Sequence, residues 1–180
     1  MRIGSTLMKD LRTAFLLLAV LALSAAGCGY RFSGEGPGPR PGLRRVAIPL
    51  FENDTAEPGL ETLFAGELRR EFLTRGSMEA TSEGEAEAVF RGRVVNIYTV
   101  EVAHRDVEET IESRLYVTLN IHCEDAETKS VLWSANGFSY YEEYFQNEDP
   151  MVSYENRRQA LEVIAREMAV RIHDRFLSNF

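Results

Sequence analysis

Residues that carry chemistry are scarce in this chain. Its 180 residues include two cysteines and three histidines, and His104, His122 and His173 share no spacing that a metal site or a catalytic pair would need. The sequence also lacks a serine nucleophile elbow, a phosphate-binding glycine loop and a zinc-ligand pattern. Its carboxylates cluster in turn-like segments such as 83–87, which is typical of a solvated surface. We therefore predict no enzyme, no cofactor and no metal site.

The hydrophobic run at the start of the chain is too short to span a membrane. Residues 14–26 include a single polar residue, Ser24, and three basic residues precede them. As a helix this run would reach about 20 Å, against a hydrocarbon core of about 30 Å. A basic start followed by a short apolar run is typical of a secretory signal peptide, which we place at residues 1–27.

The residues after this run indicate where the chain is cut and modified. Ala25, Ala26 and Gly27 lead into Cys28, and this stretch resembles the lipobox of bacterial lipoproteins. The resemblance implies that Cys28 carries lipid and is residue one of the mature chain. Two or three acyl chains would then tether the protein durably, each buried CH₂ adding about 0.8 kcal/mol. Because Ala25 stands where most lipoboxes have leucine, an ordinary cleavage site followed by an unmodified Cys28 is the alternative.

Basic residues are in deficit. Removal of residues 1–27 takes away three basic residues and Asp10, so 17 basic and 27 acidic residues remain, a net charge of −10. This charge disfavours nucleic acid as a partner, because a phosphate-binding surface needs a basic excess. If Cys28 is lipidated, Cys123 is the remaining cysteine, which excludes a disulfide framework. We expect Cys123 to be buried on the apolar face of a strand.

The mature chain divides into a leader and one domain. Residues 33–42 alternate glycine and proline with few other residues, so we expect residues 28–42 to form a flexible leader. The length and composition of residues 43–180 suit a single globular domain with one core.

Hydrophobic spacing predicts the elements of this domain. A strand is expected at 45–51, ending near Pro49, and a helix from Pro58 to Gly76, with a further short strand at 78–81. Residues 89–103, 110–123 and 131–144 alternate as three long strands of an antiparallel meander, and residues 153–179 form a second amphipathic helix. The order predicts an α+β two-layer sandwich, a mainly antiparallel four-stranded sheet with two helices packed on one face.

Two groups of side chains on this sheet are candidate contact sites. Arg91, Arg93 and Arg114 share its polar face and could meet a phosphorylated ligand, or they could pair across strands with Glu112 or Glu101. An aromatic group near the end of the third long strand suits a protein interface, or it could lie half under a helix and half at a sheet edge. This group contains Phe138, Tyr140, Tyr141, Tyr144 and Phe145.

Several segments are similar to one family. They are Cys-Gly-Tyr-Arg-Phe at 28–32, the strand and turn at 46–55, residues 57–61, residues 88–94 and the closing helix. Together they resemble the lipopolysaccharide-assembly lipoprotein family (LptE, also called RlpB) over essentially the whole mature chain.

The resemblance implies a location, partners and a role. It implies a lipoprotein on the periplasmic side of the outer membrane that plugs the LptD β-barrel, assists barrel assembly and contacts lipopolysaccharide. Gly29 is compatible with sorting to the outer membrane, because inner-membrane retention usually depends on aspartate at that position. The acidic mature chain departs from the basic lipopolysaccharide contacts credited to the family. The alternative is a periplasmic interaction lipoprotein of another system, such as a cell-wall synthase activator or a secretion-channel component.

Overall fold

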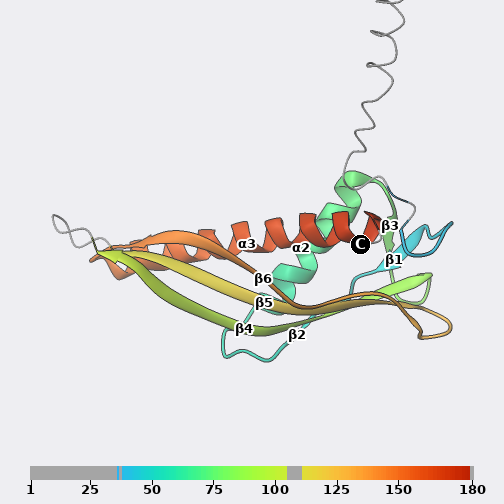
Figure 1. Cartoon of the computed structure of the whole chain (residues 1–180), viewed down its shortest axis with the longest axis horizontal. Coiled ribbons are helices and arrows are strands. Elements are labelled where there is room, and N and C mark those ends of the chain that lie inside the picture. Colours follow the sequence, from blue (N-terminus) through green and yellow to red (C-terminus); the bar gives the residue numbers. More distant parts are fainter. Residues whose placement is uncertain (1–35, 37, 105–110, 179–180) are drawn as a thin grey trace, which may run out of the picture. The chain divides into compact units, whose positions relative to one another are not determined.

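The computed structural model of the chain describes residue 36 and residues 38–104 and 111–178. In this part, six strands form one sheet and two helices lie against it (Figure 1). The elements in chain order are β1 (Arg45–Ala47), β2 (Glu52–Asn53), α2 (Leu60–Arg75), β3 (Glu79–Thr81), β4 (Ala88–His104), β5 (Ile111–Asp125), β6 (Val131–Gln146) and α3 (Pro150–Ser178). The predicted signal peptide, Cys28 and the connection between β4 and β5 lie outside the described residues.

The sheet confirms the predicted meander and corrects the number and direction of the other strands. Its order is β3-β1-β4-β5-β6, with β2 also paired to β4. The β4–β5 and β5–β6 pairs are antiparallel, but β1 lies between β3 and β4 and is parallel to both. The predicted four-stranded, mainly antiparallel sheet is therefore a mixed sheet of six strands, in which α2 serves as the crossover that the parallel β1–β3 pair needs. The α+β class and the two helices are confirmed.

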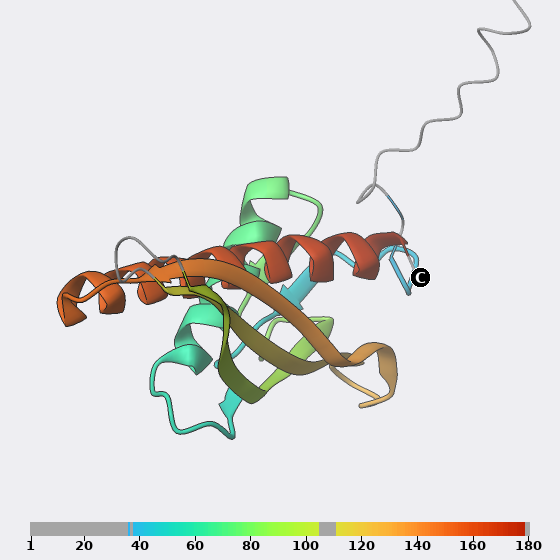
Figure 2. The ribbon, with the colours of Figure 1, turned by 60° about the vertical axis from the view of Figure 1, so that its left-hand side comes forward.

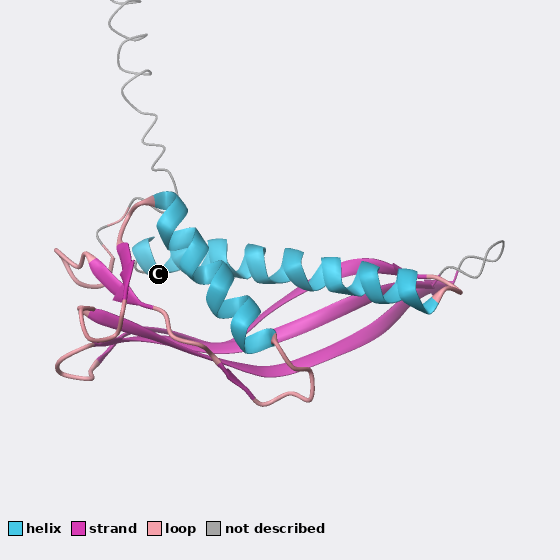
Figure 3. Ribbon diagram, turned by 180° about the vertical axis from the view of Figure 1, so that it is seen from behind, coloured by secondary structure: helices cyan, strands magenta, loops and turns pink. Residues whose placement is uncertain are grey.

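Both helices cover the same face of this sheet (Figure 3). The three long strands twist strongly as they pass α3 (Figure 2), and neither of the two described helices lies on their other face. Helix α2 buries Leu60, Phe64, Leu68 and Phe72 at spacings of four, as predicted, and ends at Gly76. The N–H of Gly76 donates to the carbonyl of Phe72 at 3.1 Å, and its φ of 62° is one that glycine adopts without strain.

Asn53 fixes the turn that leads from β2 into α2. Its side-chain amide donates to the carbonyl of Glu57 at 2.7 Å and to the Glu61 carboxylate at 3.0 Å. Its Oδ1 accepts from the backbone N–H of Thr55 at 3.0 Å and from the Thr55 hydroxyl at 2.7 Å. Glu57 in turn accepts two 2.6 Å hydrogen bonds from Arg157 of α3. This segment therefore ties the start of α2 to α3.

Four aromatic rings form the centre of the core. They are Phe72 of α2, Phe90 of β4, Trp133 of β6 and Phe176 of α3. The Phe90 centroid lies 4.9 Å from that of Phe176 and 5.3 Å from that of Phe72, so one ring joins the sheet to both helices. Cys123 is fully buried nearby, as expected, and burial raises the pKa of its thiol to about 12. Cys123 is thus an unreactive core residue.

His173 is a buried titratable group between the two helices. It is 1% exposed, its ring lies edge-on to Phe72, and its Nε2 is 2.8 Å from the Ser77 hydroxyl. Burial lowers its pKa below the ordinary 6.5, although the neighbouring Asp174 opposes that shift. The folded protein therefore holds this imidazole neutral under conditions in which the unfolded chain would protonate it.

We expect His173 to make the stability of the fold depend on pH. The unfolded chain binds the extra proton, so the His173 contribution is complete above pH 6.5 and falls as the pH drops through 6.5 toward the folded pKa. His173→Gln keeps a hydrogen-bonding group near Ser77 but removes the titration. Urea unfolding at pH 7.5 and 5.5 should show a smaller stability difference in this variant than in the wild type. An equal difference in both proteins would assign the pH dependence to other groups.

Candidate functional site

The helix-free face of the sheet carries a row of three stacked tyrosines. Tyr98, Tyr116 and Tyr141 are paired across β4, β5 and β6 in the strand register, so their side chains leave the same face. The Tyr98 and Tyr116 centroids are 4.9 Å apart with an interplanar angle of 4°, and those of Tyr116 and Tyr141 are 5.2 Å apart. Tyr98 and Tyr141 remain 46% and 44% exposed. We call these three residues the tyrosine row.

Apolar side chains and one ion pair border the tyrosine row. Val100 and Phe145 are 44% and 49% exposed beside it. The Arg114 guanidinium carbon lies 5.1 Å from the Tyr141 ring centroid, and Arg114 Nε donates to Glu143 at 2.7 Å. Within this ion pair the charges of Arg114 and Glu143 offset each other. Stacked rings with exposed edges and hydroxyls suit contact with an uncharged polar protein surface.

The structure divides the predicted aromatic interface between the two faces of the sheet. Tyr141 and Phe145 lie on the exposed face, whereas Tyr140 and Tyr144 point toward α3. Tyr144 is 7% exposed, and the Arg171 guanidinium carbon lies 4.8 Å from the Tyr140 ring centroid. Alternate residues of a strand point to opposite faces, so a cluster that is continuous in sequence is split in space.

Tyr98 and Tyr116 were not among the interface residues predicted from the sequence. Tyr98 and Tyr116 lie at nearly equal sequence distances from the β4–β5 connection. In the same way, Tyr116 and Tyr141 lie at nearly equal sequence distances from the β5–β6 turn. In an antiparallel pair such positions face each other. This symmetry was the signal that could have found the row.

The three candidate arginines do not form one group. Arg91 and Arg93 lie opposite His122 and Asn120 of β5, whereas Arg114 is six residues further along that strand, about 20 Å away at roughly 3.4 Å per residue. Each arginine already has carboxylate partners among the described residues. The ion pairs join Arg91 to Glu83 and Glu124, Arg93 to Glu52 and Asp54, and Arg114 to Glu143.

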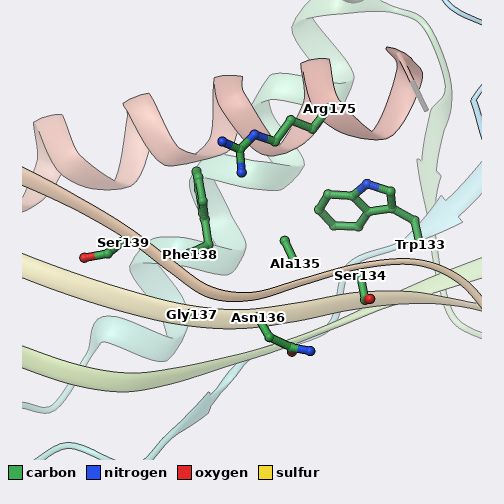
Figure 4. Close-up of a pocket in the computed structure, with 8 residues that line it drawn as sticks. All are labelled: Trp133, Ser134, Ala135, Asn136, Gly137, Phe138, Ser139 and Arg175. Carbon is green, nitrogen blue, oxygen red and sulfur yellow. The ribbon is translucent and has the colours of Figure 1, made fainter. Parts of the chain in front are cut away.

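A recess of about 670 Å³ lies between β6 and α3 (Figure 4). Residues Asn136 and Gly137 bulge out of the β5–β6 ladder there, and the Gly137 N–H donates to the Asn120 side chain at 2.8 Å. Arg175 reaches over Phe138, with its guanidinium carbon 4.8 Å from the ring centroid. The residues that line the recess are Trp133, Ser134, Ala135, Asn136, Gly137, Phe138, Ser139 and Arg175. One cation among apolar and hydroxyl groups could accept a small amphipathic anion.

No group of three or more histidine, cysteine, aspartate or glutamate side chains in residues 38–104 and 111–178 is arranged to hold a metal ion. Neither of the two described helices is long and apolar enough to cross a membrane.

Comparison with protein families identifies the chain. The model of the LptE family, described as "Lipopolysaccharide-assembly", matches residues 43–176. The chain belongs to the LptE family. It is therefore a member of a lipopolysaccharide-assembly lipoprotein family, as the resemblance in the sequence predicted, and the match does not favour the alternative lipoprotein systems. No curated protein matches the sequence.

Solved structures share the fold of this LptE-family chain at low sequence identity. Uncharacterized lipoprotein B from Nitrosomonas europaea is 11% identical, with a TM-score of 0.50 over 84% of this chain and 92% of that one. A neuraminyllactose-binding hemagglutinin homologue from Helicobacter pylori is 15% identical, with a TM-score of 0.50 over 81% of this chain and 88% of that one. At these identities the likeness establishes the fold alone.

The segments that first indicated the LptE family have structural roles in this member. Phe51 is 5% exposed and packs against Gly92 of β4, and Asn53 forms the turn that starts α2. The family resemblance in the turn region thus rests on residues that build the fold, whereas the tyrosine row lies outside the segments that resemble the family.

Proposed function

We propose that this LptE-family lipoprotein is anchored on the periplasmic side of the outer membrane and plugs an LptD-type β-barrel. In this role it assists assembly of the barrel and takes part in the transport of lipopolysaccharide to the cell surface. Membership of the LptE family supports a role in lipopolysaccharide assembly. The tyrosine row is the observation that supports contact with another protein. No catalytic step is assigned to the chain.

The chemistry of the tyrosine row suits the inner wall of a barrel. The interior of an outer-membrane barrel is polar, so a plug needs a surface that buries area while still forming hydrogen bonds. Tyrosine offers both, because its ring is apolar and its hydroxyl donates and accepts. The opposite face of the sheet is already covered by α2 and α3. Two copies of a chain with a mature charge of −10 would repel each other, which disfavours self-association through this face.

Tyr116→Asp should sharply weaken association with the barrel. The substitution places a carboxylate at the centre of the tyrosine row, and an unpaired charge buried in an interface costs several kcal/mol. We expect the amount of barrel recovered with the tagged lipoprotein from detergent-solubilised outer membranes to fall at least about tenfold, which corresponds to about 1.4 kcal/mol. Barrel maturation and surface lipopolysaccharide should fall with it.

Tyr154→Asp is the matched control for this experiment. Tyr154 is 62% exposed on α3, away from the tyrosine row, and the substitution introduces the same charge. It should leave barrel recovery unchanged, and thermal melts should show that both variants fold. Equal recovery with wild type and Tyr116→Asp would contradict the assignment of the row. Normal barrel maturation and surface lipopolysaccharide after depletion of the whole protein would contradict the function, and recovery of a penicillin-binding protein instead would indicate the alternative.

Direct contact of Arg91, Arg93 and Arg114 with lipopolysaccharide remains a prediction. A phosphate group would have to displace the carboxylates that these arginines now bind. Replacement of all three by alanine should weaken lipopolysaccharide binding by the purified protein. Unchanged binding would remove this assignment and direct attention to Arg175 in the recess beside β6, which has no ion pair among those of the described residues.

A further inference from the structure

The described part of the leader is attached to the domain. The Gly38 N–H donates to the carbonyl of Leu177, near the end of α3, at 3.2 Å. Two residues later, Arg40 forms an ion pair with Asp125 at the start of the β5–β6 turn. Leu43 then enters the core with 6% of its surface exposed. The sequence predicted a flexible leader between the lipid and the domain. The described part of this leader instead binds two separate elements of the fold.

Glycine at position 36 permits this attachment. A Cβ there would collide with the Leu177 carbonyl oxygen and would lie 2.8 Å from its carbonyl carbon, so any side chain would force the leader away from α3. The other anchor point is held firmly, because Asp125 also accepts hydrogen bonds from the backbone of Glu127 at 3.0 Å and of Thr128 at 2.9 Å. The leader thus meets a preformed carboxylate.

The attachment shortens the tether between the lipid and the domain. Eight Cα–Cα steps lead from Cys28 to Gly36, and they span at most about 28 Å when fully extended. A leader that was free up to Gly42 would span up to about 50 Å by the same rule. Helix α3, with 29 residues, is about 43 Å long, so the shortened tether is shorter than the helix to whose end it is attached.

We infer that the docked leader sets the orientation of the domain on the membrane. The end formed by the C-terminus of α3 and the β5–β6 turn faces the bilayer, and the tyrosine row lies about 30 Å farther along the strands. The latter distance follows from the nine residue steps from Tyr116 to Asp125 in β5 at roughly 3.4 Å each. This inference rests on the lipidation of Cys28 that the proposed function includes.

Energy transfer from a labelled bilayer tests this orientation. The full-length lipidated protein is reconstituted in vesicles of phosphatidylethanolamine and phosphatidylglycerol that carry a headgroup dye. A second dye is attached at Glu127→Cys, in the β5–β6 turn, or at Met151→Cys, which is at the start of α3 and 72% exposed. The buried Cys123 should not react with the dye, since its pKa is about 12. We expect transfer to be at least twofold stronger at Glu127→Cys than at Met151→Cys.

Variants of the leader provide the control. Gly36→Ala with Arg40→Glu should abolish at least half of the difference between the two labels and should speed amide exchange at Gly38 at least tenfold. Arg44→Glu makes the same charge change at an exposed side chain that is in none of the ion pairs of the described residues, and it should change neither measurement. Vesicle binding with equal transfer at both labels would overturn the orientation and leave lipidation intact. Failure to bind vesicles, together with no fatty-acid incorporation that depends on Cys28, would overturn both.

Discussion

Phe90→Ala should cost about 3 to 5 kcal/mol of unfolding free energy. Phe90 has no exposed surface, and its ring contacts Phe72, Trp133 and Phe176, so its loss would leave a cavity where the sheet meets both helices. Because small domains are stable by only about 5 to 15 kcal/mol, the variant should be partly unfolded or melt far below the wild type. Urea unfolding of the unlipidated Cys28→Ser protein, followed by circular dichroism, gives the difference.

Phe145→Ala is the matched control, because it removes the same side chain from the same sheet at a site that is 49% exposed. Its cost should stay within about 0.5 kcal/mol, as is usual for surface substitutions. A similar loss in both variants would show that the aromatic cluster is not the centre of stability.

Gly92→Ala should cost about 1 to 3 kcal/mol, although it adds a single methyl group. A Cβ at Gly92 would lie 2.5 to 2.6 Å from three atoms of the Phe51 ring, and that ring is buried between the turn and β4. Neither group can move without disturbing the segment that starts α2. Unfolding by urea, with an unchanged slope, measures the loss.

A second substitution distinguishes this steric cause from a general weakness of β4. Phe51→Ala removes the ring, so the addition of Gly92→Ala to that variant should cost much less than it does in the wild type. Gly66→Ala in α2 has no atom within 4 Å of the new Cβ and should stabilise the protein by up to about 1 kcal/mol. Strictly additive costs at positions 51 and 92 would contradict the proposed contact.

The long elements with a periodic hydrophobic pattern could be predicted from the sequence, whereas the pairing of the short strands could not. Apolar residues alternate with polar ones along β4, β5 and β6, and they recur every four residues in α2. Both patterns arise because one side of the element is buried, so they can be read directly from the sequence. The three residues of β1 are too few to display which strands they pair with. Their parallel pairing depends on α2, which returns the chain so that β3 runs beside β1 in the same direction.

The candidate sites were predictable to different degrees for the same reason. The separation of Tyr140 and Tyr144 from Tyr141 and Phe145 follows from strand alternation alone. The partners of Arg91 and Arg93 do not, because Glu83 and Glu52 come from connecting segments whose approach to the sheet depends on the whole fold. The docked leader was equally hidden, since Arg40 meets a residue 85 positions away.

Helix α3 is the last described element, and its place in the core affects the order of folding. Ten of its residues are buried, and Phe176, near its end, completes the aromatic cluster. During synthesis, which proceeds from the N-terminus, the core therefore cannot be completed until Phe176 has been released from the ribosome. A stop codon that removed the last two turns of α3 would leave the core open and make the protein a target for proteases.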